Sequence, residues 1–275
     1  MDAEALPYNA KAAYHINSTN VTFPAQASAT DVDILEFTTV DNVGVGIHAY
    51  GAGGTFGSRA SADFFGPDQA IVQSLFELSL ADLGPTLTLD VTPGEVAVHG
   101  PAGGLVAGDF LSGMVEFHIE LDGVTIYENV VGARLDSTSA TAAESPAGAN
   151  TVSLNLGLTC SHSFVDGDAS CIIGGGSTLL DLDTLAGHTG KHSLYYAIFA
   201  EARGLLTDTS GCGGGFGGNG EVTATAAFLE GGEGGGKSCG IIARSGDPVP
   251  EPATFALAPL ALAGVAVARR RQRRA

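Results

Sequence analysis

Short runs of alternating apolar and polar residues recur along most of the chain, and the clearest lies at residues 114–131. Asp122-Gly123 interrupts this run and has the sequence of a two-residue hairpin turn in which both residues adopt positive φ. Pairing outward from the turn gives the pairs Leu121–Val124, Ile119–Ile126, Phe117–Glu128 and Val115–Val130. The opposite face then carries Glu116, His118, Glu120, Thr125, Tyr127 and Asn129. The segment is therefore predicted to be a β-hairpin with one face on a core and the other in water.

The same period of two residues marks further strands. It appears at Val43, Val45 and Ile47, at Leu87, Leu89 and Val91, and at Val152, Leu154, Leu156 and Leu158. Segments 70–82 and 191–206 also alternate and are predicted to be strands, with a short helix in 70–82 as the alternative. Glycine, proline or aspartate separates neighbouring runs. The pattern predicts an all-β fold, an antiparallel β-sandwich that is jelly-roll-like.

Several segments lack this alternation. Residues 132–150 are small and polar and are predicted to form either a long loop or an interdomain linker. Residues 211–220 and 231–237 are predicted to be glycine-rich loops on either side of a strand at Glu221–Glu230. The 40 glycines of the chain fit this architecture, because glycine is costly inside helices and favourable in tight turns.

The charge is distributed unevenly. The chain of 275 residues has a net charge of −18, with 12 basic and 30 acidic residues. Five of the basic residues lie in the last seven positions, so the remaining 268 residues carry 7 positive and 30 negative charges, a net −23. Such an acidic surface repels phosphate groups, which argues against a nucleic-acid partner. It favours solubility outside the cell and attracts divalent cations.

The C-terminal tail at 247–275 differs from the rest. Pro250, Glu251 and Pro252 precede fourteen apolar or small residues, Phe255–Ala268, and these precede a basic cluster. A helix of that length spans about 21 Å, short of the ~30 Å hydrocarbon core, but flanking residues can extend it and arginine side chains can reach the interface. The basic cluster consists of Arg269, Arg270, Arg271, Arg273 and Arg274. By the positive-inside rule it stays in the cytoplasm, and the chain before Pro250 lies outside.

These residues resemble the PEP-CTERM sorting signal. The resemblance implies a Gram-negative bacterium in which an integral-membrane exosortase recognises the motif and removes the tail, often alongside exopolysaccharide synthesis. It divides the chain into an exported β-rich domain at 1–246, which the 132–150 segment would subdivide if it is a linker, and a sorting tail at 247–275. The precursor is expected to be held briefly in the inner membrane, and the product at the cell surface or in the extracellular matrix.

The first residues lack the basic and apolar regions of a secretory signal peptide. We expect translation to start upstream of Met1, with a different export arrangement as the alternative.

Four cysteines in an exported chain indicate disulfides. Of the three connectivities, the local one is predicted: Cys160–Cys171 across a hairpin, and Cys212–Cys239 around a glycine-rich stretch. Zinc is the rival interpretation, but no pair has the CxxC spacing that tetrahedral zinc sites usually show.

Other motifs are interpreted as structural. Residues 231–238, GGEGGGKS, match the phosphate-binding loop pattern, but glycines and a proline follow where that loop needs a helix. His188 and His192 have the i, i+4 spacing of zinc ligands, yet the glycines around them favour a turn with surface histidines. Three acidic pairs, Asp31/Asp33, Asp166/Asp168 and Asp181/Asp183, are expected to belong to turns before they serve as calcium ligands. We therefore expect no metal, no cofactor and no catalytic residue.

The function expected from the sequence is that of a non-enzymatic structural protein of the cell surface or biofilm matrix. The alternative is a carbohydrate-binding or adhesive module, for which Tyr195 and Tyr196 are the candidate aromatic contacts. A secreted hydrolase is a third class, although no carboxylate pair is singled out.

Overall fold

The computed structural model describes residues 8–16, 19–28, 31–52, 55–91, 93–148, 150–208 and 239–245. Within these ranges the chain forms sixteen strands and one short helix, α1 (Leu182–Ala186). Each strand pairing is antiparallel, which confirms the predicted all-β class; the jelly-roll connection stays a prediction. The predicted strand at Glu221–Glu230, its flanking loops and the C-terminal helix lie outside the described residues.

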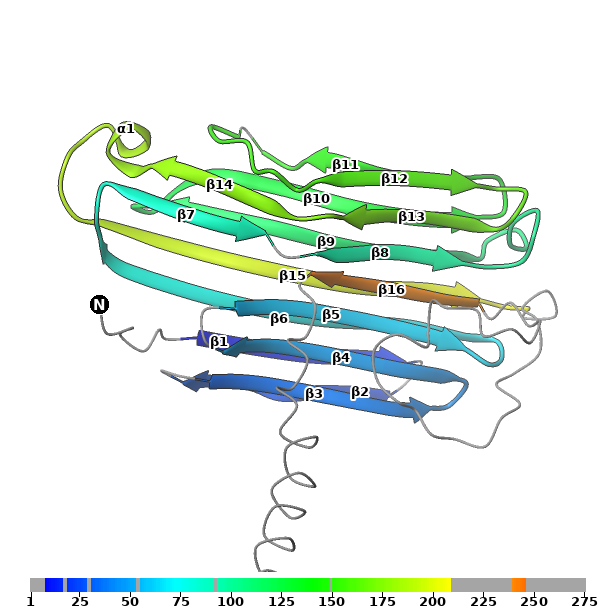
Figure 1. Cartoon of the computed structure of the whole chain (residues 1–275). Coiled ribbons are helices and arrows are strands. Elements are labelled where there is room, and N and C mark those ends of the chain that lie inside the picture. Colours follow the sequence, from blue (N-terminus) through cyan, green and yellow to red (C-terminus); the bar gives the residue numbers. More distant parts are fainter. Residues whose placement is uncertain are drawn as a thin grey trace, which may run out of the picture.

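Two seven-stranded sheets lie one behind the other, with their strands running in similar directions (Figure 1). Sheet A has the order β11 (Ala140–Pro146), β10 (Val124–Asp136), β9 (Phe110–Leu121), β15 (His192–Leu206), β6 (Asp68–Leu83), β1 (Tyr8–Ile16), β2 (Thr19–Ser28). Sheet B has the order β12 (Leu158–Ser163), β13 (Asp168–Ile173), β8 (Gly94–His99), β16 (Cys239–Ser245), β5 (Thr55–Phe64), β4 (Val43–Ala52), β3 (Asp31–Val40). A small sheet pairs β7 (Thr86–Val91) with β14 (Gly176–Asp181).

The core lies between the two large sheets, because alternate side chains of their strands point inward. In β9 every second residue from Leu111 to Leu121 is buried, and β6 alternates in the same way from Asp68 to Leu78. Sheet B contributes inward residues such as Ile47 and Ile173. Burial of these side chains supplies the main driving force for stacking the sheets.

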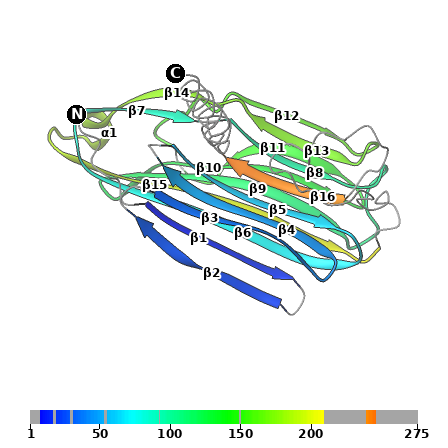
Figure 2. The same cartoon turned by 60° about the horizontal axis from the view of Figure 1, so that its bottom comes forward.

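Strands β15 and β16 occupy the central position of each sheet, as Figure 2 shows. β15 pairs with β6 on one side and β9 on the other, and β16 pairs with β5 and β8. Both strands come late in the chain. In each sheet, the central strand lies between three strands from the first part of the chain and three strands from its middle.

The predicted hairpin at 114–131 is present as β9 and β10. Asp122 (φ 50°) and Gly123 (φ 78°) form the turn, as expected for a primed two-residue loop. The register beyond the turn was predicted wrongly, because an irregularity between Thr125 and Tyr127 shifts the pairing by one residue. Tyr127 pairs with Ile119, where the sequence predicted Ile126.

This shift exchanges the two faces of β10. Tyr127 and Asn129, predicted to face water, are each 3% exposed, whereas Glu128 and Val130 are only partly buried. A β-bulge adds one residue to a strand and thereby reverses the alternation that follows it. On β9, by contrast, Phe117 and Ile119 are fully buried, as predicted.

The segments 70–82 and 191–206 are strands, as predicted, within β6 and β15. The segment 132–150 was predicted to be a loop or linker, yet its first residues complete β10 and residues 140–146 form β11. β11 is an edge strand with mostly exposed side chains, so the backbone ladder forms it without an apolar pattern.

The predicted strand at 152–158 is also wrong, although its alternation correctly marks burial. Leu154 and Leu156 are buried, but residues 152–157 form no ladder, and β12 begins only at Leu158. The alternating side chains pack on the core, while the backbone makes isolated hydrogen bonds and no ladder. One is local, from the Leu156 amide to the Leu154 carbonyl at 3.1 Å, and another reaches β10, from the Val152 amide to the Ile126 carbonyl at 3.3 Å.

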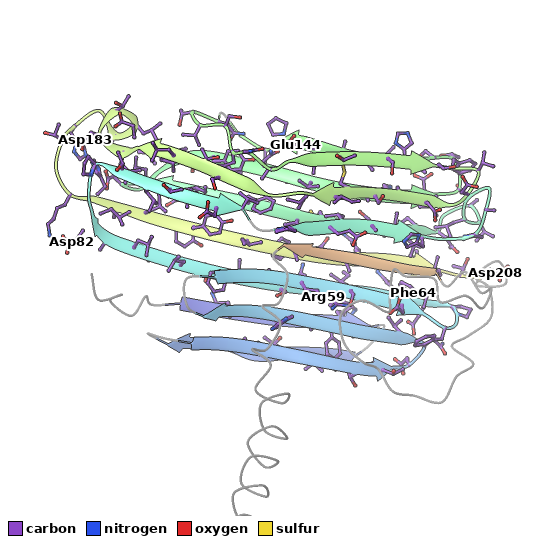
Figure 3. The ribbon with its side chains drawn as sticks, in the orientation of Figure 1. Arg59, Phe64, Asp82, Glu144, Asp183 and Asp208 are labelled. Atoms are coloured by element: carbon purple, nitrogen blue, oxygen red, sulfur yellow. A yellow bond between two sulfur atoms is a disulfide. The ribbon has the colours of Figure 1, made fainter. Side chains whose placement is uncertain are left out.

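The contact between the sheets is tight at Gly204 of β15. A Cβ placed there would lie 2.6 Å from the ring of Phe64 and 3.0 Å from Leu111. Phe64, labelled on β5 in Figure 3, is 2% exposed and has little room to move. We therefore expect Gly204→Ala to lower the free energy of unfolding by about 1–3 kcal/mol, the usual cost of overpacking a core.

The matched control is Gly132→Ala on β10 of the same sheet, where the nearest atom to an added Cβ is 3.7 Å away. This substitution should leave stability unchanged or slightly higher, because alanine restricts the unfolded chain. Chemical denaturation of both variants measures the difference. Equal effects of the two substitutions would contradict the packing described here.

Candidate functional site

A buried histidine between two carboxylates lies where β15 begins. His192 is 2% exposed, and its side chain is inaccessible to solvent. Its Nδ1 lies 2.9 Å from Oδ2 of Asp122, and its Nε2 lies 2.9 Å from Oδ1 of Asp183. Figure 3 shows Asp183 at the end of the sandwich where α1 lies. We call Asp122, Asp183, His188, His192 and Ser193 the His192 cluster.

The local chain brings Asp183 to this point through α1. Asp181 caps the helix N-terminus by accepting hydrogen bonds from the amide and hydroxyl of Thr184, at 3.0 and 2.9 Å. Gly187, in the left-handed conformation (φ 72°), ends the helix after five residues. This short helix positions Asp183 against the first residue of β15.

Asp122 comes from the β9–β10 turn and is fixed by Ser193. The Asp122 amide donates to the Ser193 carbonyl at 2.9 Å, and the Ser193 amide donates to Asp122 Oδ1 at 2.7 Å. The Ser193 hydroxyl donates to the same oxygen at 3.1 Å. Because Oδ1 is thus engaged, Oδ2 is the oxygen that faces His192.

His188 completes the cluster from the segment between α1 and β15. Its Nε2 lies 3.4 Å from Asp122 Oδ2, and its ring stacks on that of His192 with 4.9 Å between the centroids. Two imidazole nitrogens therefore converge on a single carboxylate oxygen.

The electrostatics follow from these contacts. The hydrogen bonds of His192 to Asp183 and then to Asp122 raise the pKa of His192, because both stabilise the imidazolium. The hydrogen bond from His192, followed by that from the Ser193 amide, lowers the pKa of Asp122 to about 2. Both carboxylates thus favour the protonated form of His192.

The two histidines of the cluster differ in exposure. His188 is exposed, as predicted, but His192, expected at the surface, is buried. The correction has a topological cause, since Asp122 lies 70 residues away and reaches His192 only because β9 pairs with β15. Asp183 was considered as a calcium ligand and instead bonds His192.

The remaining acidic pairs have separate local roles. Asp168 lies 2.8 Å from Nδ1 of His99, and Asp166 accepts a hydrogen bond from the Ser163 hydroxyl at 2.5 Å. Asp31 and Asp33 lie on β3, and their side chains are outside the described part of the structure.

The two candidate tyrosines lie on opposite faces of β15. Tyr196 is 6% exposed and faces the core, so it is not available to a ligand, and its burial raises the pKa of its hydroxyl. Tyr195 is partly exposed on the outer face of sheet A, where its hydroxyl donates to Glu77 at 2.6 Å. The structure thus retains Tyr195 alone as a candidate contact.

The predicted disulfide between Cys160 and Cys171 is present, with Cα atoms 4.0 Å apart. It joins directly opposed residues of β12 and β13 and so secures an edge strand of sheet B. Cys239 begins β16, but its side chain and Cys212 lie outside the described residues, so the second pairing stays a prediction.

The sorting motif, Pro250, Glu251 and Pro252, and the five arginines also lie outside the described residues. Among the helices that are described, none is long and apolar enough to cross a bilayer. Comparison with known families matches residues 248–273 to the PEP-CTERM protein-sorting motif. No curated protein and no solved structure matches the chain.

The fold and the matched tail together define the class: an exported all-β protein of Gram-negative bacteria, sorted through its C-terminus. More specifically, the chain carries a PEP-CTERM sorting signal at residues 248–273, as its sequence indicated.

The His192 cluster should matter for stability. We expect His192→Ala to lower the midpoint of chemical denaturation, because it removes a buried imidazole that hydrogen-bonds to both Asp122 and Asp183. Lys191→Ala is the neighbouring control, since Lys191 and Asp82 form an exposed ion pair at 2.8 Å that contributes little. A midpoint shift no larger for His192→Ala than for Lys191→Ala would contradict this role.

Proposed function

We propose that this protein is a non-enzymatic structural component of the cell surface or biofilm matrix, delivered there by exosortase. The observation that carries the proposal is the position of the sorting signal. The match begins at residue 248, and β16 ends at Ser245. The β-sandwich is therefore attached almost directly to the segment that directs its sorting.

The composition of the sandwich supports an extracellular location. Its strong negative charge favours solubility and disfavours nonspecific contact with other acidic polymers. The Cys160–Cys171 disulfide fits an oxidising compartment, because such bonds persist outside the cytosol. Two seven-stranded sheets with a continuous core between them suit a durable scaffold.

The tail supports a two-stage route. The apolar run Phe255–Ala268 and the basic cluster would hold the precursor in the inner membrane, with the sandwich outside. Cleavage near Pro250–Thr254 would then release the sandwich with β16 intact, since β16 ends before the motif.

This route is testable by intact-mass analysis of the protein from an exosortase-containing host. We expect the surface form to lack the residues that follow the Pro250–Thr254 region. Glu251→Ala should leave the uncleaved precursor in the inner membrane, because it alters the recognised motif, whereas Asp247→Ala, just before the matched segment, should be processed normally. Protein that still ends at Ala275 in the surface fraction would refute the proposal.

A second candidate function, carbohydrate binding, is favoured by the outer face of sheet A. Glu77 accepts the Tyr195 hydroxyl at 2.6 Å and lies 3.4 Å from the ammonium group of Lys11. The His118 ring meets the Tyr195 ring edge-on at 6.0 Å and lies 3.0 Å from Glu120. A partly exposed aromatic ring beside hydrogen-bonding groups offers both the apolar surface and the polar contacts that a sugar ring uses.

Glycan-array binding by the purified protein tests this second candidate. Tyr195→Ala should abolish binding, because it removes the ring. Tyr195→Phe should keep most of it, because it removes only the hydroxyl that Glu77 already engages. Absence of glycan binding by the unmodified protein, or equal binding by the alanine variant, would exclude this role while leaving the sorting route intact.

A further inference from the structure

We propose that the His192 cluster binds one divalent transition-metal ion, Zn²⁺ foremost, through Asp122 Oδ2, His188 Nε2 and His192 Nδ1. This site is separate from the sorting signal and from the outer face of sheet A. It would be an additional property of the exported domain.

The positions of the three ligand atoms carry the inference. Asp122 Oδ2 lies 2.9 Å from His192 Nδ1 and 3.4 Å from His188 Nε2, and the three residues each place one ligand atom within 4.8 Å of the other two. Zinc binds nitrogen and carboxylate oxygen at about 2.0–2.2 Å, so its tetrahedral ligands lie roughly 3.4 Å apart. Small side-chain rotations therefore suffice to place the three atoms around one ion.

The surrounding hydrogen bonds orient these atoms toward a common point. His192 Nε2 is engaged by Asp183 at 2.9 Å, and Nδ1 faces Asp122 Oδ2, so Nδ1 is the nitrogen that an ion bound to this oxygen would meet. Asp122 Oδ1 is engaged by the amide and hydroxyl of Ser193, which leaves Oδ2. A carboxylate behind a ligating histidine, and hydrogen bonds to a ligating carboxylate, are the usual second layer of a metal site.

The donor set selects the class of ion. Two imidazoles and one carboxylate suit zinc and other first-row transition metals, whereas calcium and magnesium prefer all-oxygen sites. An entering ion takes the place of the proton between His192 Nδ1 and Asp122 Oδ2, so binding releases one proton. Asp122 and His188 are exposed, which leaves the fourth position open to water or to a group from another molecule.

An ion at this point would connect two distant segments of the chain. Asp122 belongs to the β9–β10 turn, and both histidines lie at or just before the start of β15. The ion would thus fix the end of the central strand of sheet A to the neighbouring hairpin.

Titration of the purified full-length chain with Co²⁺, followed by displacement with Zn²⁺, tests the proposal. We expect one equivalent of Co²⁺ to produce the visible absorption of a low-symmetry nitrogen and oxygen site. His188→Ala should weaken binding by at least tenfold; the side chain is exposed, so the variant should fold. Asp183→Asn should weaken it about 10–100-fold, as is typical of the layer behind the ligands.

His99→Ala is the matched control, because His99 pairs with Asp168 at 2.8 Å in a comparable but two-membered contact. It should bind Co²⁺ as the unmodified chain does, and Zn²⁺ should raise the melting temperature of both but not of His188→Ala. Equal affinity of the unmodified chain and His188→Ala would overturn the proposal, as it would assign binding to the acidic surface. Failure of the unmodified chain to give the Co²⁺ spectrum would overturn it as well.

Discussion

The sandwich depends on the hydrogen bonds that β15 and β16 make on both of their edges. Without β15, sheet A would divide into β11-β10-β9 and β6-β1-β2, and without β16, sheet B would divide into β12-β13-β8 and β5-β4-β3. The core would be divided along the same line, because each half-sheet packs on the half-sheet opposite it. Gly204 marks how closely this junction is filled, since β15 there has no room for a side chain between Phe64 and Leu111. The two central strands thus join the two pairs of half-sheets into one sandwich with a single core.

Much of this fold can be predicted from the sequence, because the burial of a strand's two faces is encoded in neighbouring residues. Alternation of apolar and polar residues reports which face of a strand is buried, and it correctly identified β4, β6, β9 and β15. Asp122-Gly123 identified its turn because few sequences tolerate two successive positive φ angles. The same signal failed for β11, whose residues are mostly exposed, and at residues 152–157, where side chains alternate but the backbone forms no ladder.

The bulge in β10 and the His192 cluster could not be predicted from the sequence, because both depend on contacts between distant segments. Nothing in Thr125-Ile126-Tyr127 signals an extra residue, and only the pairing with β9 shows that Tyr127 turns inward. The spacing of His188 and His192 suggested a metal site or a surface turn. The decisive partner, Asp122, was assigned only to a hairpin turn. The disulfide between Cys160 and Cys171 could be predicted from the sequence, because its two cysteines belong to one hairpin.

The position of β16 also has a consequence for the order in which the protein can be made and folded. Sheet B cannot close until residues 239–245 are present between β5 and β8, and these residues are almost the last before the sorting signal. Pairings so distant in sequence form slowly, because the intervening chain must first be brought together. During synthesis from the N-terminus, the domain therefore stays incomplete until nearly its whole length has been made. The last strand that sheet B needs and the sorting signal are synthesised almost together, because β16 ends at Ser245 and the matched segment begins at residue 248.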